Sequence, residues 1–294
     1  MSLNTLCVLG CGTMGKAILS GLLQAREEGV SDLPGTLVAC VKQVSSAEKL
    51  QDTFQDNVQV ILQDNASGVQ KADLVILGCK PQVALDLLAD PKMQQVLTGK
   101  TIISICAGIT IEQLQEAVPR SNHCIRAMPN TPCQIRCGMT IISHPHTFPP
   151  EALAPIIKIF STLGRCRVLE DRHLNVITAL SGSGPAFACV IMEALADGGV
   201  MMGLPRDVAV EVAAQALKGA SSMVLETGAH PAALKDAVTT PAGCTIAGLL
   251  TMEDGKIRST LARTIQEASR VAGSLGNGGL TGNKGLTTPA SDDN

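Results

Sequence analysis

The chain has 294 residues, 45% of them hydrophobic and 17% charged, which is enough for one large or two medium domains with buried cores. Lys and Arg (23) are fewer than Asp and Glu (26), the formal net charge is −3, and Trp and Tyr are absent. This balance argues against nucleic acid or an anionic membrane as a partner, because both favour a cationic surface and base stacking also needs aromatic rings.

The eleven cysteines are odd in number, show no Cys-x-x-Cys spacing and lie mostly inside apolar runs. Buried, reduced thiols in a cytoplasmic protein are therefore expected in place of disulfides or zinc. The histidines lack the spacing of a metal motif, so no metal site is predicted. Met1–Asn4 lacks the basic segment of a signal peptide and no apolar run reaches membrane-spanning length, which also favours the cytoplasm.

Up to about residue 169, short apolar runs typical of strands alternate with helical patterns. The expected strands are Thr5–Leu9, Leu37–Val41, Val58–Leu62, Asp73–Cys79, Thr101–Cys106, His123–Met128, Met139–Ser143 and Cys166–Leu169. The expected helices are Met14–Glu28, Ser46–Phe54, Pro81–Leu88, Ile111–Val118, which opens on a capping box at Thr110, and Glu151–Leu163. This alternation indicates an α/β fold, a Rossmann-type doubly wound and mostly parallel sheet over residues 1–169.

From residue 170 to residue 276 the strand signal stops and an all-α domain is expected. Its helical segments are Asn175–Gly203, Asp207–Thr227, Pro231–Val238 and Ile246–Gly276. They are poor in charge for exposed helices, so we expect them to pack against a second copy in a homodimer or higher homo-oligomer. Close packing within one subunit is the alternative. Residues 277–294 are of low complexity and are expected to be disordered.

The loop Gly10-Cys11-Gly12-Thr13-Met14-Gly15 follows the first strand and opens the first helix. In this context Gly10 permits a tight turn, Gly12 lets the backbone approach a pyrophosphate, and Gly15 lets helix and strand pack closely. The loop therefore predicts a dinucleotide site. A plain turn between strand and helix is the alternative.

The end of the second strand indicates which nicotinamide cofactor binds. Enzymes that use NAD usually place Asp or Glu there to bond the ribose hydroxyls, whereas this chain continues with Lys42, Gln43 and two serines. A cation and hydroxyls suit a 2′-phosphate, so NADPH is preferred and NADH is the alternative donor. Lys42 taken alone also fits a solvated lysine, and Asn65 and Lys80, which follow the third and fourth strands, also fit ordinary turn residues.

A second turn of this kind lies near the end of the chain, at Val238–Leu249. Thr, Pro and Gly precede an apolar helical pattern, and the free N–H groups at a helix N-terminus can hold a carboxylate. The hydroxyls of Thr240 and Thr245 lie beside that position. The chain thus offers one anion-binding turn for a cofactor and another for a small acid.

These features make the chain resemble the pyrroline-5-carboxylate reductases over roughly residues 3 to 276. The motifs that carry the resemblance are Gly10–Gly15, Cys79-Lys80-Pro81, Ala107-Gly108, Met128-Pro-Asn-Thr-Pro132, Ser181-Gly-Ser-Gly-Pro-Ala-Phe187 and Pro231–Leu249. In this family the last motif usually reads Pro-Gly-Gly-x-Thr, and here Ala242 replaces the first glycine. A methyl group there is tolerated at negative φ, whereas at positive φ the turn is strained.

The resemblance implies an NAD(P)H-dependent reduction of a cyclic imino acid, the last step of proline biosynthesis. It also implies a helical dimerisation domain and an active site formed between the cofactor domain of one subunit and helices of the other. Because a protonated imine accepts hydride readily, the enzyme's main task is positioning. A threonine hydroxyl suffices to place the ring nitrogen or to relay a proton.

The same resemblance implies roles for individual residues. Thr240, Gly243 and Cys244 would hold the substrate carboxylate, and Thr245 would bond the ring nitrogen as the catalytic residue, with a plain helix N-cap as its alternative role. Asp171 would supply an acid near the site, and Glu170 aligns there equally well. The implied cofactor contacts are Leu9, Gly10, Cys11, Gly12, Thr13, Met14, Asn65, Cys79, Lys80 and Ala107, with Asn130 near the nicotinamide.

Two other functions remain open at this point. A β-hydroxyacid dehydrogenase has the same domain order, but its helical lysine is followed one turn later by Asn, whereas Lys218 is followed by Gly219-Ala-Ser-Ser222. A nicotinamide-nucleotide-binding protein without turnover would need the glycine loop but not the hydroxyl-rich turn at Thr239–Thr245.

Overall fold

The computed structural model describes residues 4–275, and these form two compact units. One unit runs to Gly182 and takes in the described residues from Ser269 onward; the other is Ser183–Ala268. The expected division at residues 169 and 170 stays a prediction, and the expected disordered tail at residues 277–294 lies outside the described residues.

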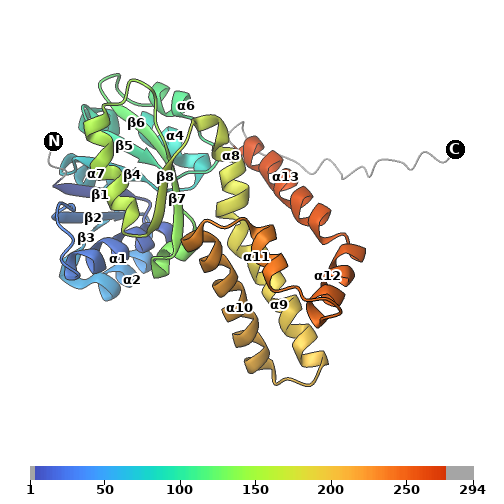
Figure 1. Ribbon diagram of the computed structural model, residues 1–294. Coiled ribbons are helices and arrows are strands. Elements are labelled where there is room, and N and C mark those ends of the chain that lie inside the picture. The colour runs from blue at the N-terminus through green and yellow to red at the C-terminus, as the bar shows by residue number, and fades with distance from the viewer. Residues whose placement is uncertain (1–3, 276–294) are drawn as a thin grey trace. The chain divides into compact units, whose positions relative to one another are not determined.

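The first unit is built on an 8-stranded sheet in the order β3-β2-β1-β4-β5-β6-β7-β8 (Figure 1). Its strands are β1 Thr5–Leu9, β2 Thr36–Val41, β3 Gln59–Leu62, β4 Leu74–Leu77, β5 Thr101–Ser104, β6 His123–Met128, β7 Gly138–Ser143 and β8 Gly164–Val168. All pair in parallel except β6 with β7. The strand order reverses between β1 and β4, so the predicted doubly wound sheet is confirmed.

Helices cover both faces of this sheet. One face carries α1 Thr13–Glu27, α2 Val44–Phe54 and α7 Pro150–Ser161; the other carries α3 Asn65–Gln70, α4 Pro81–Ala89, α5 Pro91–Leu97 and α6 Ile111–Glu116. The capping box at Thr110 is confirmed, since its hydroxyl accepts from Gln113 N and the Gln113 side chain accepts from Thr110 N. The short helices α3 and α5 were not predicted.

The sheet is buried on both faces because successive strand residues alternate sides. In β1, Leu6 and Val8 belong to the core beneath α1, whereas Cys7 and Leu9 belong to the core beneath α4. Strands buried on both faces read as continuous apolar runs. This pattern is why all eight strands were found from the sequence, with ends that differ by a few residues.

After β8 the chain is helical throughout its described part. A short turn at Asp171–His173 leads into α8 Leu174–Ile177 and a π-helical segment at Thr178–Gly182, followed by α9 Gly184–Met201, α10 Arg206–Thr227, α11 Pro231–Ala237, α12 Cys244–Asp254 and α13 Ile257–Leu275. The single helix expected at residues 246–276 is wrong, because Gly255 ends α12 and Lys256 has a φ of 53°.

Helices α9 and α10 pack through small side chains. Ala196 on α9 and Ala209 and Ala213 on α10 are buried together. A Cβ at Gly199 would lie 3.3 Å from the Cβ of Ala209. Such small contacts allow close approach of two helices but bury little area, which leaves most other side chains of this unit exposed.

Two helical stretches, Asp171–Met201 and Arg206–Thr227, are long and apolar enough to cross a membrane by length and composition alone. The expectation that no apolar run has this length is therefore wrong. Ala and Gly occur throughout these helices and interrupt the runs of large apolar residues. The mean hydropathy nevertheless stays at the level of a membrane-spanning segment. Only 11% of the apolar window in each stretch is buried within the single chain.

Candidate active site

The glycine loop lies at the point where the strand order reverses. Gly10 has a φ of 73°, and a Cβ placed on it would come within 2.7 Å of the N and Cα atoms of Cys79. The N–H groups of Gly10 and Cys11 both donate to the carbonyl oxygen of Cys40, at 3.0 and 3.1 Å. The loop is therefore held between the ends of β1, β2 and β4, as a dinucleotide fold requires.

The other two glycines of the loop differ from Gly10. A Cβ at Gly15 would lie 2.9 Å from the sulfur of Cys11 and from a methyl group of Val8, so this glycine permits α1 to pack on β1. Gly12 is exposed and extended just before α1, with free space around its Cα. Its position leaves the helix N-terminus accessible to an anion.

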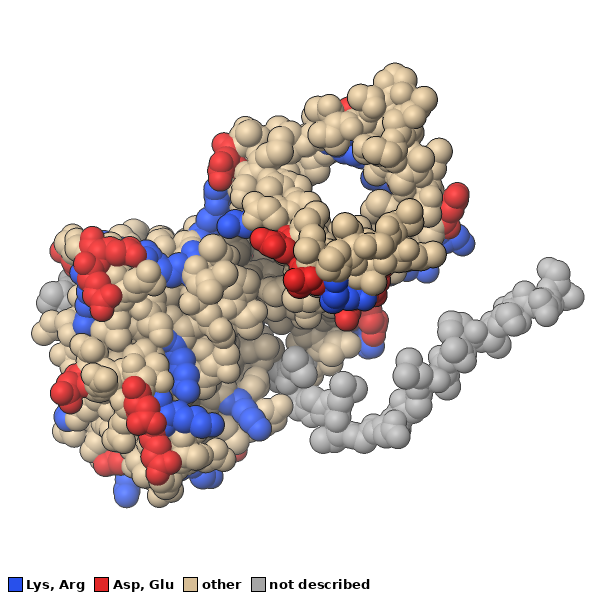
Figure 2. Space-filling view, turned by 90° about the horizontal axis from the view of Figure 1, so that it is seen from below, with Lys and Arg blue, Asp and Glu red and all other residues tan. Residues whose placement is uncertain are grey.

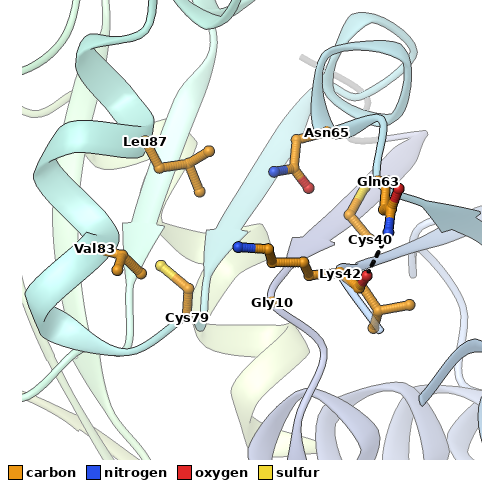
Figure 3. Close-up of a pocket in the computed structure, with 9 residues that line it drawn as sticks. Gly10, Cys40, Lys42, Gln63, Asn65, Cys79, Val83 and Leu87 are labelled. Atoms are coloured by element: carbon orange, nitrogen blue, oxygen red, sulfur yellow. Dashed lines mark hydrogen bonds between the residues drawn. The ribbon is translucent and has the colours of Figure 1, made fainter. Parts of the chain in front are cut away.

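A cavity of about 620 Å³ opens beside this loop (Figure 3). Its lining is Gly10, Cys40, Val41, Lys42, Gln63, Asn65, Cys79, Val83 and Leu87. Of the predicted cofactor residues, Gly10, Lys42, Asn65 and Cys79 are thus brought together. Leu9, Cys11, Gly12, Thr13, Met14, Gly15, Lys80, Ala107 and Asn130 are not among its lining residues.

Sequence reasoning missed the far side of this cavity. Val83 and Leu87 are one helical turn apart on α4 and give it an apolar wall suited to a base, and that spacing was visible in the sequence. Gln63 has a φ of 59°, and its Nε2 donates to the carbonyl oxygen of Lys42 at 3.2 Å. This bond ties the turn after β3 to the turn after β2.

Lys42 is exposed, and its side chain extends into the cavity in Figure 3. No Asp or Glu is among the residues that line the cavity. Asn65 is the first residue of α3, whose N-cap Asp64 accepts a hydrogen bond from Ser67 N at 3.1 Å. Hydrogen bonds from Ser67 hold the pKa of Asp64 below its usual range. The cap fixes the start of α3 and with it the position of Asn65.

The pKa values of two thiols in this region are shifted in opposite directions. Burial raises the pKa of Cys11 to about 12, so this thiol stays protonated beneath the loop. Cys79 is half-buried, and a hydrogen bond from the Cys106 side chain lowers its pKa. All eleven cysteines are free thiols, and six of them are buried, whereas Cys137, Cys189 and Cys244 are exposed.

Asn130, predicted near the nicotinamide, uses its amide for internal contacts. Its Nδ2 donates to the carbonyl oxygen of Ser181 at 3.1 Å, and its Oδ1 accepts from Met139 N at 2.9 Å. The side chain therefore links the loop after β6 to the π-helical segment. Ala107 lies after β5 and packs against the small core that contains Leu174.

Asp171 forms an ion pair with Arg126, whose Nη1 lies 2.9 Å from Asp171 Oδ1. Arg126 is only 3% exposed, and its Nε and Nη2 have no hydrogen-bond partner within the described part of the chain. Glu170 instead pairs on the surface with Arg172. Asp171 is thus the acid fixed to the sheet, because removing it would leave a buried charge unpaired.

The second unit contains the other predicted turn. Gly243 N donates to the carbonyl oxygen of Thr240 at 3.1 Å, Pro241 follows Thr240, and Ala242 has a φ of 57°. Pro at the second position and positive φ at the third define a type II turn, which normally requires Gly at the third. Strain in this turn was expected if the φ of Ala242 were positive, and the structure shows that it is positive.

The turn leads directly into α12. Gly243 is its N-cap and makes no side-chain cap, so the first N–H groups of the helix remain available. Thr245 is the second residue of the helix and half-buried. The alternative role of Thr245 as helix N-cap is therefore wrong. A Cβ at Gly243 would lie 2.5 Å from Thr240 Oγ1, so glycine is required there to keep that hydroxyl in place.

A nucleotide cavity at the reversal of a doubly wound sheet, followed by a helical unit, defines the class of NADP-dependent oxidoreductases of the Rossmann type. Residues 5–108 match the family described as NADP oxidoreductase coenzyme F420-dependent. Residues 171–275 match the pyrroline-5-carboxylate reductase dimerisation domain.

Individual relatives agree with this assignment. The chain is 45% identical over 278 residues to the pyrroline-5-carboxylate reductase of Schizosaccharomyces pombe, covering 92% of this chain and 98% of the relative. It is 36% identical over 253 residues to that of Escherichia coli, covering 86% and 91%. The chain belongs to the pyrroline-5-carboxylate reductase family.

Solved structures show the same architecture. The pyrroline carboxylate reductase of Plasmodium falciparum, determined with NADP bound, superposes with a TM-score of 0.81 at 26% identity, covering 94% of this chain and 99% of that one. The enzyme of Coxiella burnetii gives a TM-score of 0.81 at 27% identity. The predicted fold, family and cofactor class are confirmed.

We predict that Ala242→Gly stabilises the protein. Left-handed backbone costs a residue with a Cβ about 1–2 kcal/mol, and the added freedom of glycine in the unfolded chain offsets about 0.5–1 kcal/mol of the gain. Thermal unfolding should therefore show a higher Tm for the variant. Ala247→Gly, within α12, is the matched control and should lower Tm. A lower Tm for both variants would show that the turn at Ala242 is not strained.

Proposed function

We propose that the chain reduces 1-pyrroline-5-carboxylate to L-proline with NADPH. The observation that carries this proposal is the 45% identity to a pyrroline-5-carboxylate reductase. It is supported by a cavity beside the glycine loop in the sheet unit and, in the helical unit taken by itself, by a helix N-terminus open to a carboxylate. NADPH, when bound, would supply hydride to the imine carbon of the ring, which becomes C5 of proline, and the ring nitrogen would keep its proton.

For the cofactor, the glycine loop and the N-terminus of α1 are suited to the pyrophosphate, and the apolar wall of Val83 and Leu87 to the adenine ring. Lys42 reaches into the cavity without an acidic neighbour among its lining residues, which favours a 2′-phosphate over a ribose hydroxyl. The bond from Gln63 to the Lys42 carbonyl oxygen holds this segment in place. These assignments make NADPH the preferred donor.

We predict that Lys42→Gln lowers the preference for NADPH over NADH about tenfold, because a charged hydrogen bond contributes about 1.5 kcal/mol. The measurement is the ratio of kcat/KM with the two donors. Lys49→Gln, an exposed lysine on α2, is the matched control and should leave the ratio unchanged. An unchanged ratio in Lys42→Gln would assign Lys42 to the solvated surface.

For the substrate, the N–H groups of Cys244 and Thr245 open α12 and carry the positive end of the helix dipole, whereas the Gly243 N–H already donates to the Thr240 carbonyl oxygen. A carboxylate bound there orients a small ring, and the Thr240 hydroxyl adds a donor. The Thr245 hydroxyl makes no hydrogen bond within the described part of the chain and is assigned to the ring nitrogen. Asp171, fixed by Arg126, is proposed as the acid that favours the protonated imine.

We predict that Thr245→Ala lowers kcat about ten- to a hundredfold, near the lower end of a general acid's contribution. The assay follows NADPH oxidation with 1-pyrroline-5-carboxylate. Thr251→Ala, on the same helix, should retain activity, and Thr245→Ser should restore most of it because the hydroxyl returns.

The same assay separates the competing functions. Turnover with 3-hydroxy acids and NADP⁺ would indicate a β-hydroxyacid dehydrogenase, and nucleotide binding without turnover of any of these compounds would indicate a non-catalytic protein. Either outcome, or full activity of Thr245→Ala, contradicts the role proposed here.

The helical unit is proposed to form a homodimer or a higher homo-oligomer. Many of its large apolar side chains are exposed, among them Val190, Leu195, Met201, Met202, Val210, Val212, Leu225 and Leu250. In Figure 2 the surface of the helical part is mostly tan, with charges of both signs scattered on it. A dimerisation match over residues 171–275 favours a second copy over a membrane as the cover. Eleven free thiols suit the reducing cytoplasm, where we place the protein.

We predict that the protein sediments as a dimer or larger species and that Val190→Asp shifts it toward monomer, because a charge in an apolar interface loses its hydration. Val190 is 65% exposed in the single chain, and Ile135→Asp, at 74% exposed in the sheet unit, is the matched control. Monomeric wild type that floats with phospholipid vesicles would instead assign the apolar helices to a membrane.

A further inference from the structure

Two pairs of neighbouring cysteines next to the glycine loop have different surroundings. Cys7 on β1 and Cys40 on β2 have sulfurs 3.6 Å apart, and both are 0% exposed. The hydrogen bond with Cys40 and burial raise the pKa of Cys7 well above its usual range. Both thiols are sealed from solvent and Cys7 stays protonated, so this pair is inert toward oxidants.

The second pair, Cys79 and Cys106, follows two adjacent parallel strands. Leu77 of β4 lies opposite Ser104 of β5, and each cysteine comes two residues after one of these partners. The Cys106 thiol donates to the carbonyl oxygen of Cys79 at 3.2 Å, so the two residues remain neighbours past the strand ends. Adjacent strands lie about 4.8 Å apart, within the Cα spacing of about 4.4–6.8 Å that a disulfide spans.

Only Cys79 of this pair reaches the nucleotide cavity. Its side chain lines that cavity and is partly exposed in it (Figure 3), whereas Cys106 is 4% exposed. The hydrogen bond from Cys106 lowers the pKa of Cys79, while the interaction with Cys79 and burial raise that of Cys106. Cys79 therefore combines thiolate character with access from the cavity, and its neighbour Cys106 is a buried, protonated thiol.

We propose that Cys79 and Cys106 form a dithiol that is sensitive to oxidants. Oxidation of this dithiol weakens cofactor binding in the cavity, and bound cofactor protects the two thiols from oxidation. The inference rests on the proposed cofactor site. The Cys79 thiolate attacks a peroxide oxygen, the O–O bond breaks, and hydroxide leaves, giving a sulfenic acid at Cys79. The Cys106 sulfur then attacks the Cys79 sulfur, the S–O bond breaks, and the departing hydroxide takes the Cys106 proton as water.

The reason that oxidation acts on the cavity is the contact with Gly10. The space beside Gly10 is already filled by the Cys79 backbone, at 2.7 Å from a Cβ position. Rotating Cys79 toward Cys106, or adding oxygen to its sulfur, moves the surface on which the glycine loop rests. An oxidised protein therefore binds NADP⁺ more weakly, and a protein holding NADP⁺ reacts more slowly with peroxide.

The test treats the full-length protein with hydrogen peroxide, with and without NADP⁺, and locates modified thiols by mass spectrometry of unreduced peptides. We expect a Cys79–Cys106 cross-link, with the intact mass lower by two hydrogen atoms. At ten times its Kd, NADP⁺ should slow cross-linking about tenfold, because only the unliganded fraction reacts. Cross-linking should weaken NADP⁺ binding at least about tenfold in a direct titration, and dithiothreitol should restore it.

Two variants sharpen the test. Cys106→Ser should still form a sulfenic acid at Cys79, trapped by dimedone, but no disulfide. Cys137→Ser, which removes an exposed thiol, is the matched control and should cross-link as the wild type does. A wild type without the cross-link, or one whose cross-linking NADP⁺ does not slow, overturns the inference. These readouts do not use imine reduction, so they stand apart from the test of the proposed reaction.

Discussion

The contact between the Gly10 backbone and the Cys79 backbone is the constraint on which the proposed nucleotide site depends. It closes the ends of β1 and β4 to a distance that only glycine permits. The same loop is bonded to β2 through the Cys40 carbonyl oxygen. Three strand ends are thereby fixed against one another, and the residues that follow them, Lys42 after β2 and Cys79 after β4, are brought to a single cavity.

Much of this arrangement could be predicted from the sequence because it follows from local patterns. The strands could be recognised because both of their faces are buried, which makes each of them a continuous apolar run. The loop at Gly10 could be recognised because its three glycines have a fixed spacing in the sequence. The helices α3 and α5 have 6 and 7 residues, too few for an apolar period to emerge, whereas the equally short α6 was found through its capping box. The caps of α3 and α5, Asp64 and Asp90, were the available signal.

What the sequence could not predict depends on distant parts of the chain or on backbone dihedral angles. Asp171 meets Arg126 across 45 residues, and no local pattern links them. Gln63 lines the cavity and has a positive φ, which is unusual for glutamine. The strain at Ala242 could be predicted only in part. The family pattern identified the position, but only the backbone φ shows that the turn keeps the conformation that a glycine would adopt there.

The path of the chain through the two compact units limits how the protein can be divided. The sheet unit takes in the described residues from Ser269 onward, and among them Ala272 is 4% exposed, while a Cβ at Gly273 would lie 3.4 Å from the Asn175 side chain. The nucleotide-binding unit is therefore discontinuous in sequence, with the helical unit inserted into it. A fragment that stops at Gly182 loses part of its own packing, so a shorter nucleotide-binding protein would have to rejoin residue 182 to the end of α13 with a linker.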